Sequence, residues 1–250
     1  MEESQATVFY SWQSDSPASK NKNLIRRAIT VACKLQIDEA IRIDEATQDV
    51  SGSPDIPDTI LSKIRQSAVA VFDLTIVGES FNARSGADQR KRALPNPNVL
   101  VELGYAAAQI GWERIVAVFN TSGGHTPEEL PFDLRHRRFP ITYDSAQGTA
   151  KAENHLVGEL TRALGLCLGA PHEQARVMRR GLDHDVLVVL DKVGLADCFH
   201  HSGDISIETI RRMLDLGMIW CDQAPKHKLY AYHFTYVGEL LRAQRQTERC

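Results

Sequence analysis

The sequence lacks the short motifs that mark several large enzyme classes. It has no GxGxxG run and no GxxxxGKS/T run, which argues against a Rossmann dehydrogenase and a P-loop nucleotidase. It has no GxSxG, so nothing supports a Ser-His-Asp hydrolase of that type. His125, His136 and His155 show neither HExxH nor a comparable metal-ligand spacing. We therefore predict no metal site and no resident cofactor.

A dominant charge is missing as well, and so are long apolar runs. The chain has 29 Lys and Arg residues against 32 Asp and Glu residues, which argues against a nucleic-acid coat and a polybasic membrane surface. No apolar run approaches the roughly 20 residues that span a bilayer, and the acidic start MEESQ does not resemble a signal peptide. The five cysteines have no CxxC spacing. We expect a cytoplasmic protein with no membrane partner.

What the first 169 residues do contain is a regular alternation of short apolar runs and helical patterns. We predict strands at residues 7–12, 41–46, 68–74, 115–119 and 139–143, and helices at 23–35, 57–66, 95–109 and 150–166. Residues 79–95 lack periodicity and are predicted to form a loop. Five strands alternating with helices indicate an α/β fold with a parallel five-stranded sheet, in the flavodoxin-like order 2-1-3-4-5.

The helix predicted at residues 95–109 carries a polar stripe, and we expect it to begin at Asn96 or Asn98. Four of its polar residues recur at intervals of three or four and share one helix face: Asn98, Glu102, Tyr105 and Gln109. This places a carboxylate beside a phenol and an amide, and we predict Glu102 as the catalytic residue. The alternative is that the stripe is simply the hydrated side of an amphipathic helix.

A second group of candidates follows from the topology. Parallel sheets of this order bind ligands beyond the carboxyl ends of their strands, near the switch point between the first and third strands. This rule selects residues 10–15 after the first strand, Asp73 and Thr75 after the third, and the start of the helix that carries Glu102.

Two of these segments resemble a known family. FYSWQSD at residues 9–15 and NPNVLVELGYA at residues 96–106 are similar to bacterial TIR-like domains, the effector modules of antiphage systems such as TIR-STING and Pycsar TIR proteins. The resemblance covers about residues 6–169. It implies cleavage of NAD, as a substrate, at the bond between ribose and nicotinamide, with Glu102 as the essential glutamate. Nucleoside deoxyribosyltransferases share the fold and a similarly placed glutamate, so a nucleoside or nucleotide N-glycosidase is the alternative enzyme.

For such a reaction the sequence offers six substrate-binding candidates: Ser11, Trp12, Asp73, Asn98, Tyr105 and Arg135. Ser11 and Trp12 lie where a loop would contact the base or the nicotinamide ribose, although Trp12 also suits ordinary packing. Asp73 suits ribose hydroxyls or, alternatively, a turn. Arg135 could meet a pyrophosphate or form part of a solvated surface. Glu102 would lower the cost of the positive charge that develops on the sugar, electrostatically, covalently or by orienting a hydroxyl or water.

After residue 169 the pattern changes to helices followed by a β ribbon, so we predict two domains, 1–169 and 170–250. The second resembles a winged helix-turn-helix domain, with helices at 177–193, 207–216 and 237–244 and strands at 218–221 and 229–234. A DNA-binding face could include Arg211, Arg212, Lys226 and Lys228, but the domain has equal numbers of basic and acidic residues. We therefore favour a protein-protein or self-assembly module over DNA binding.

Together these observations predict a NAD glycohydrolase that acts as a regulated bacterial antiphage effector, of the abortive-infection kind. TIR-like enzymes are commonly active when assembled, so we expect a homo-oligomer on activation, triggered by a protein or nucleotide signal. The alternative outside the enzymes is a regulator that binds DNA or a partner protein through a degenerate nucleotide pocket.

Overall fold

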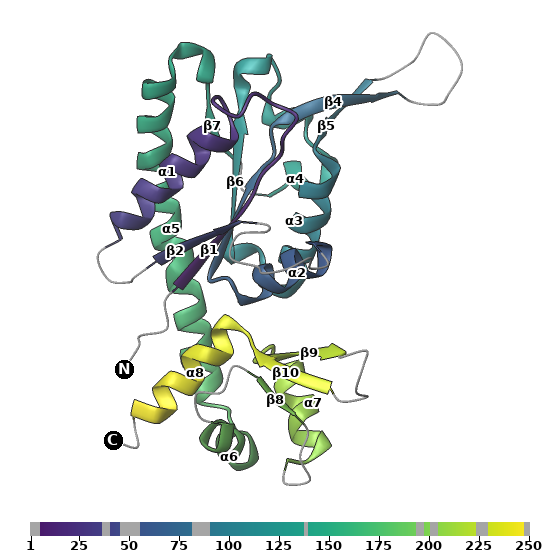
Figure 1. Ribbon diagram of the computed structural model, residues 1–250, viewed down its shortest axis with the longest axis vertical. Helices are drawn as coiled ribbons and strands as arrows, with labels where there is room; N and C mark the ends of the chain where they lie inside the picture. Colours follow the sequence, from purple (N-terminus) through teal and green to yellow (C-terminus); the bar gives the residue numbers. More distant parts are fainter. Residues whose placement is uncertain are drawn as a thin grey trace.

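The structure is a computed structural model that describes residues 6–36, 41–45, 56–81, 91–137, 140–193, 198–200, 205–223 and 230–247. Figure 1 shows an upper part built on a central sheet and a lower part formed by the last third of the chain, with one long helix running through both.

The central sheet has five strands, and each pair of neighbouring strands in it is parallel. Its order is β2-β1-β3-β6-β7. The strands are β1 (Ala6–Ser11), β2 (Ile41–Glu45), β3 (Val69–Asp73), β6 (Ile115–Asn120) and β7 (Ile141–Tyr143). The predicted α/β class and parallel five-stranded sheet are confirmed, and the strands follow one another in the predicted order 2-1-3-4-5. The carboxyl ends of β1 and β3 are therefore adjacent at the switch point.

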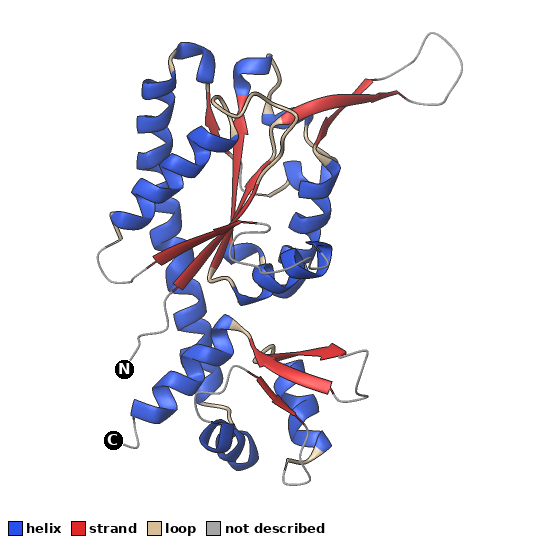
Figure 2. Ribbon diagram, in the orientation of Figure 1, coloured by secondary structure: helices blue, strands red, loops and turns tan. Residues whose placement is uncertain are grey.

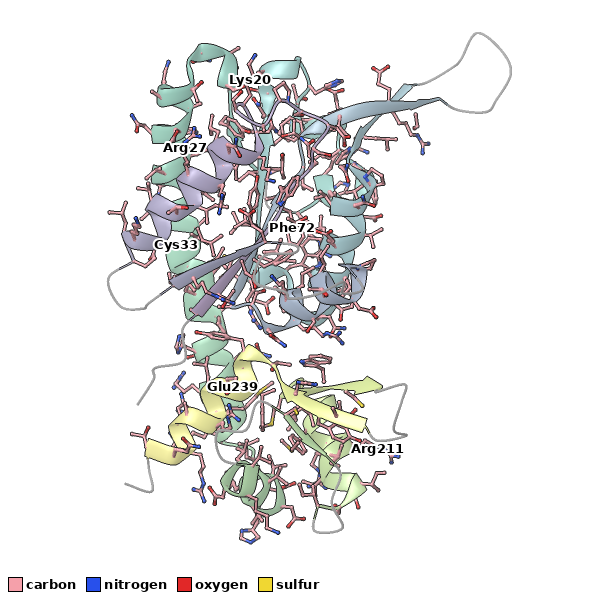
Figure 3. The ribbon with its side chains drawn as sticks, viewed as in Figure 1. Lys20, Arg27, Cys33, Phe72, Arg211 and Glu239 are labelled. Atoms are coloured by element: carbon pink, nitrogen blue, oxygen red, sulfur yellow. The ribbon has the colours of Figure 1, made fainter. Side chains whose placement is uncertain are left out.

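Helices cover both faces of this sheet (Figure 2). One face packs against α1 (Lys22–Lys34) and α5 (Thr149–Arg179), and the other against α2 (Ile56–Gln66) and α3 (Pro97–Gln109). Successive side chains of a strand point to opposite faces, so Val8 joins the first layer and Phe9 the second. Phe72 lies at the centre of the second layer (Figure 3) and is fully buried. Burial on both faces explains why β1, β3 and β6 are nearly continuous apolar runs, whereas the edge strand β2, with its exposed Arg42, alternates.

The segment predicted as a loop at residues 79–95 is instead part of a β-hairpin, and that prediction is wrong for the described residues. β4 (Ile76–Phe81) pairs antiparallel with β5 (Lys91–Pro95), with a bulge between Ile76 and Gly78. The hairpin projects from the body at the carboxyl edge of the sheet (Figure 1). Gly78, Glu79 and Arg92 are exposed, so this part of the hairpin lacks the apolar period that identifies buried strands. Arg84 and Arg90 lie outside the described residues.

The last helix of the sheet domain is longer than predicted. We expected it to end near residue 166, but α5 continues to Arg179 with Pro171 inside it. A proline in a helix interior removes one backbone hydrogen bond and costs about 3 kcal/mol, which is why the sequence indicated a break. Pro171 is buried, and α5 packs against α8 in this region, so burial of apolar surface offsets that cost. The predicted boundary between residues 169 and 170 therefore falls inside a continuous helix.

The last third of the chain pairs three helices with a small antiparallel sheet of order β8-β10-β9. Its elements are α6 (His184–Val193), β8 (Cys198–His200), α7 (Ile207–Asp215), β9 (Ile219–Gln223), β10 (Tyr230–Phe234) and α8 (Tyr236–Thr247). The helix predicted at 177–193 is divided, because α5 ends at Arg179 and α6 begins at His184. Arg211 is exposed on α7 (Figure 3), whereas Lys226 and Lys228 lie outside the described residues.

Short elements complete the upper part of the molecule. They are α4 (Phe132–Arg135) and the 3-10 helices η1 (Trp112–Arg114), η2 (Thr121–Gly123), η3 (Pro127–Glu129) and η4 (Ser145–Gln147). One cluster of buried apolar residues includes Val8 of β1, Leu164 of α5 and Leu241 of α8, so the core on the α1 and α5 side continues into the last third of the chain. Within the described ranges, no helix has the length and apolar character needed to span a membrane.

Candidate active site

The candidate site is built around α3, whose first turn is fixed by its own side chains. The Asn96 side chain accepts hydrogen bonds from the backbone N–H groups of Asn98 and Val99, and Pro97 occupies the first helical position. Asparagine is among the best N-cap residues, and proline suits the first position because no partner is needed there for its missing N–H. The predicted start at Asn96 is confirmed. Val99, Leu103 and Ala106 bury one side of α3 and leave Glu102 at its border.

Glu102 meets the carboxyl end of β1. The Ser11 hydroxyl donates a hydrogen bond of 2.6 Å to Glu102 Oε2, across 91 residues of sequence. Burial raises the pKa of Glu102 above the ordinary glutamate value of 4.5, and the hydrogen bond from Ser11 offsets part of that rise. Within the described part of the chain, Glu102 Oε1 accepts no hydrogen bond. The site thus holds a half-buried carboxylate with one oxygen oriented and one available.

Gln13 holds the loop after β1 in place. It lies in the range 10–15 that was selected from the sequence, but it was not itself named as a candidate. Gln13 is 2% exposed. Its Oε1 accepts from the backbone N–H groups of Asp15 and Ser16, and its Nε2 donates to the Ser16 hydroxyl and to Asp73. Each polar atom of this buried amide has two partners, which is the arrangement that burial of an amide requires.

The same loop is attached to the first turn of α3. Asn96 Nδ2 donates a hydrogen bond of 2.6 Å to Asp15 Oδ2. The amide of Asn96 therefore caps α3 with its oxygen and holds the loop with its nitrogen. Together with the bond between Ser11 and Glu102, this gives two attachments between the end of β1 and α3. Both of the segments that carry the family resemblance take part in them.

Asp73 lies at the end of β3, as predicted, but it is not open to solvent. It is fully buried, and its two oxygens accept from the Thr75 N–H and hydroxyl and from the side chains of Asn21 and Gln13. Burial raises the pKa of Asp73, and these hydrogen bonds counteract part of the rise. Protein donors occupy both oxygens of Asp73. We therefore infer that Asp73 holds the loops together and does not bind a ribose.

The network around Asp73 extends along the carboxyl edge of the sheet through residues that the sequence did not single out. Asn120, which ends β6, donates from Nδ2 to the side chains of Asn21 and Ser145 and accepts from the N–H groups of Ser122 and Ser145. Asn120 could have been found from its position, since it directly follows a buried strand. Asn21 and Ser145 carried no comparable signal, because each lies in a polar loop.

For Trp12, Tyr105 and Arg135, the structure shows side-chain contacts with groups other than the Ser11 hydroxyl and the Glu102 carboxylate. Trp12 packs against the core on the α1 side, and Lys22 Nζ lies 3.2 Å from the centre of its ring. Tyr105 packs against the core on the α2 side, with the guanidinium of Arg65 5.6 Å from its ring centre. Asn98 is exposed in the first turn of α3. Arg135 is exposed on α4, and its Nη1 donates to the backbone oxygen of Glu128.

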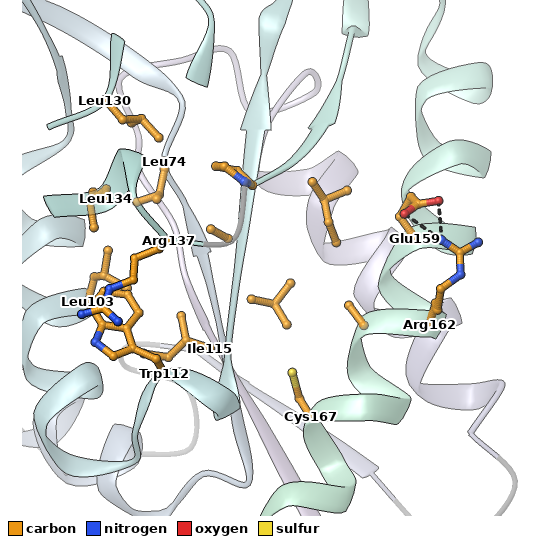
Figure 4. Close-up of a pocket in the computed structure, with 15 residues that line it drawn as sticks. Leu74, Leu103, Trp112, Ile115, Leu130, Leu134, Arg137, Glu159, Arg162 and Cys167 are labelled. Atoms are coloured by element: carbon orange, nitrogen blue, oxygen red, sulfur yellow. Dashed lines mark hydrogen bonds and ion pairs between the residues drawn. The ribbon is translucent and has the colours of Figure 1, made fainter. Parts of the chain in front are cut away.

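Two cavities lie away from this site. An apolar cavity of about 140 Å³ lies beside β6, between α3 and α4 on one side and α5 on the other (Figure 4). Its lining includes Leu103, Trp112, Leu134 and Cys167, but neither Ser11 nor Glu102. A second space of about 330 Å³ lies beside β7 and the first turns of α5, and it too excludes both residues. We therefore choose the carboxyl edge of the sheet at Glu102 as the candidate active site because of its side chains and not because of a large cavity.

A single half-buried carboxylate, oriented by a hydroxyl, can stabilise developing positive charge, act as a nucleophile or orient a hydroxyl group. Among the described residues no group of His, Cys, Asp and Glu side chains is placed to hold a metal ion. The site also offers the amino end of α3, whose first N–H groups are capped by Asn96. No family model matches this chain, and no curated protein matches its sequence.

Proposed function

We propose that the chain is an N-glycoside hydrolase that cleaves NAD between ribose and nicotinamide, with Glu102 as the catalytic carboxylate. The observation that carries the proposal is the hydrogen bond from Ser11 to Glu102. It joins the two segments that resemble bacterial TIR-like domains, and it does so beyond the carboxyl ends of β1 and β3. The strand order β2-β1-β3-β6-β7 agrees with a flavodoxin-like sheet, in which ligands bind at this switch point.

The chemistry suits a carboxylate in this setting. Nicotinamide leaves NAD as a neutral molecule and needs little protonation, so the main cost is positive charge that develops on the ribose. A carboxylate near the anomeric carbon lowers that cost, and more so where water is partly excluded. Glu102 Oε2 is held by Ser11, and Oε1 is the oxygen that would face the sugar.

In this proposal the last third of the chain regulates the enzyme. Helices α6 and α7 with the ribbon β9 and β10 agree with a winged-helix-like module. On α7 the basic side chains are partly neutralised, since Arg212 forms ion pairs with Asp183 and Glu208. This favours a protein-protein or self-assembly role over DNA binding, in keeping with an antiphage effector that is switched on by assembly.

The test consists of two assays at high protein concentration. One measures the release of nicotinamide from NAD, and the other measures the release of free bases from deoxynucleosides. The proposal expects release from NAD by the wild-type chain and loss of at least about 100-fold in Glu102→Ala. A Val101→Ala variant, at an exposed position of the same helix to which no role in the site is assigned, controls for general damage to α3. Base release from deoxynucleosides but not from NAD would move the assignment to a nucleoside N-glycosidase.

A further inference from the structure

Arg65, in the last turn of α2, is one of the residues through which the sheet domain contacts the last third of the chain. Its guanidinium lies 4.0 Å from the ring centre of Trp220 on β9 and 5.6 Å from the ring centre of Tyr105 on α3. Among the described residues Arg65 Nε is buried and has no hydrogen-bond partner, and the same holds for Trp220 Nε1. The contact is therefore made through ring faces, which a planar guanidinium does better than an ammonium group.

The ring of Trp220 is itself held in place. It is 8% exposed, and His233 of β10 stacks on it with ring centres 4.4 Å apart and an angle of 16° between the planes. His233 pairs with Trp220 across the ribbon, so the stack is built into the register of β9 and β10. The order of groups is thus His233, Trp220, Arg65 and Tyr105, from the last third of the chain to α3.

Tyr105 follows Glu102 by three residues, so the two side chains lie about one turn apart on adjoining parts of one helix surface. The amino end of α3 is attached to the loop after β1 through Asn96, and its middle meets Arg65 through Tyr105. A shift of α3 by a few tenths of an ångström would alter the 2.6 Å hydrogen bond between Ser11 and Glu102.

From this arrangement we propose that Arg65 and Trp220 are positioning residues, which hold α3, and with it Glu102, in place from the last third of the chain. The expected effect of Arg65 and Trp220 on turnover rests on the proposed function, that is, on the cleavage of NAD by this chain. Its structural part is that the β9 and β10 ribbon restrains α3 through Arg65. A partner that moved Trp220 off Arg65 would then lower the activity without touching the site.

The experiment compares Arg65→Lys and Trp220→Ala with the wild-type chain. Arg65→Lys keeps the charge but loses the planar group. Trp220→Phe, which keeps a ring, should preserve the wild-type behaviour and guards against loss of folding in Trp220→Ala. Arg137→Lys is the matched control, because Arg137 also lies over a tryptophan, at 4.5 Å, but that tryptophan, Trp112, belongs to the sheet domain and not to the last third of the chain.

The first readout is amide hydrogen exchange of residues 97–109, which needs no enzymatic activity. We expect exchange to become about 2- to 30-fold faster in Arg65→Lys and Trp220→Ala, and to stay unchanged in Trp220→Phe and Arg137→Lys. Unchanged exchange in Arg65→Lys and Trp220→Ala would overturn the proposal, even if the chain proved not to cleave NAD.

The second readout is steady-state cleavage of NAD. Arg65→Lys should lower kcat by a similar factor and leave KM within about twofold, because the variant misplaces Glu102 without removing a substrate contact. Faster exchange in α3 with an unchanged kcat would show that the ribbon restrains the helix but does not position Glu102, and would overturn that part of the proposal.

Discussion

At the scale of single residues, burial and the hydrogen bond from Ser11 act in opposite directions on the pKa of Glu102. Burial raises the pKa of this carboxyl, and the Ser11 hydroxyl counteracts the rise. Ser11→Ala removes the counteracting bond, so the pKa of Glu102 should rise further. If the ionised form is active, the acid limb of kcat/KM for NAD should move to higher pH. Ser14→Ala, a change in the same loop at an exposed serine, should leave the limb in place. A shift to lower pH in Ser11→Ala would contradict this role.

The raised pKa of Glu102 also makes the free energy of unfolding depend on pH. Because the folded-state pKa lies above the unfolded value, the protonated form favours the fold. This contribution is present in full below the unfolded pKa and is lost as pH rises through the folded pKa. Glu102→Gln is always neutral, so it should match the wild type near pH 4 and become more stable than the wild type toward pH 7. Urea unfolding across that range measures the difference. A variant that is less stable at neutral pH would show that the carboxylate is not penalised by burial.

At the scale of elements, two helical glycines give opposite expectations for the same substitution. A Cβ at Gly238 in α8 would lie 2.0 Å from the backbone oxygen of Met218, whereas a Cβ at Gly104 in α3 has nothing within 4 Å. Gly104→Ala should stabilise the chain by about 0.5–1 kcal/mol, the ordinary gain in helix propensity. Gly238→Ala should destabilise it by more than about 1 kcal/mol, because α8 must move away from the backbone of Met218, the residue before β9. Thermal unfolding of the two variants checks this pair, and equal effects would contradict the close approach of α8 and Met218.

The elements also show what the sequence can predict. β1, β3 and β6 are apolar on both faces, so their positions and type follow from composition, and α3 is marked by Asn96 and Pro97 at its start. The hairpin of β4 and β5 was missed because Gly78, Glu79 and Arg92 are exposed and give it no apolar period, although Ile76 belongs to the core. The continuation of α5 through Pro171 was missed because tertiary packing, which the local pattern does not contain, offsets the cost of a proline.

The same distinction holds for the site. Glu102 and Ser11 could be predicted, since one lies on a polar stripe and the other at a strand end, and the structure brings them together. Gln13, Asn21 and Ser145 could not be singled out, because their roles depend on which strand ends are neighbours. Asp73 could be located but not assigned, since only its burial shows that its oxygens are already occupied.

At the scale of the whole molecule, the core is continuous. The cluster of buried apolar residues on the α1 and α5 side includes residues of both parts of the chain, and α5 runs through both. Arg114 donates hydrogen bonds to the backbone oxygens of Ser67 and Ala68, at the end of the sheet domain that faces the last third of the chain. Burial lowers the pKa of Arg114 to about 10. We therefore expect one cooperative transition in calorimetry, with equal calorimetric and van't Hoff enthalpies. Two separate transitions would show that the parts unfold independently.

The central claim is that the carboxylate of Glu102 carries out cleavage of NAD. The most direct measurement is nicotinamide release by the wild-type chain and by Glu102→Gln, at equal and high protein concentration, with products identified by mass spectrometry. Glutamine keeps the size of the side chain and can accept the hydrogen bond from Ser11, so the two proteins should have the same fold and differ in charge. The account predicts release of nicotinamide with formation of ADP-ribose by the wild type and a loss of at least about 100-fold in the variant. Equal release by both proteins, or release by neither under conditions that favour assembly, would contradict it.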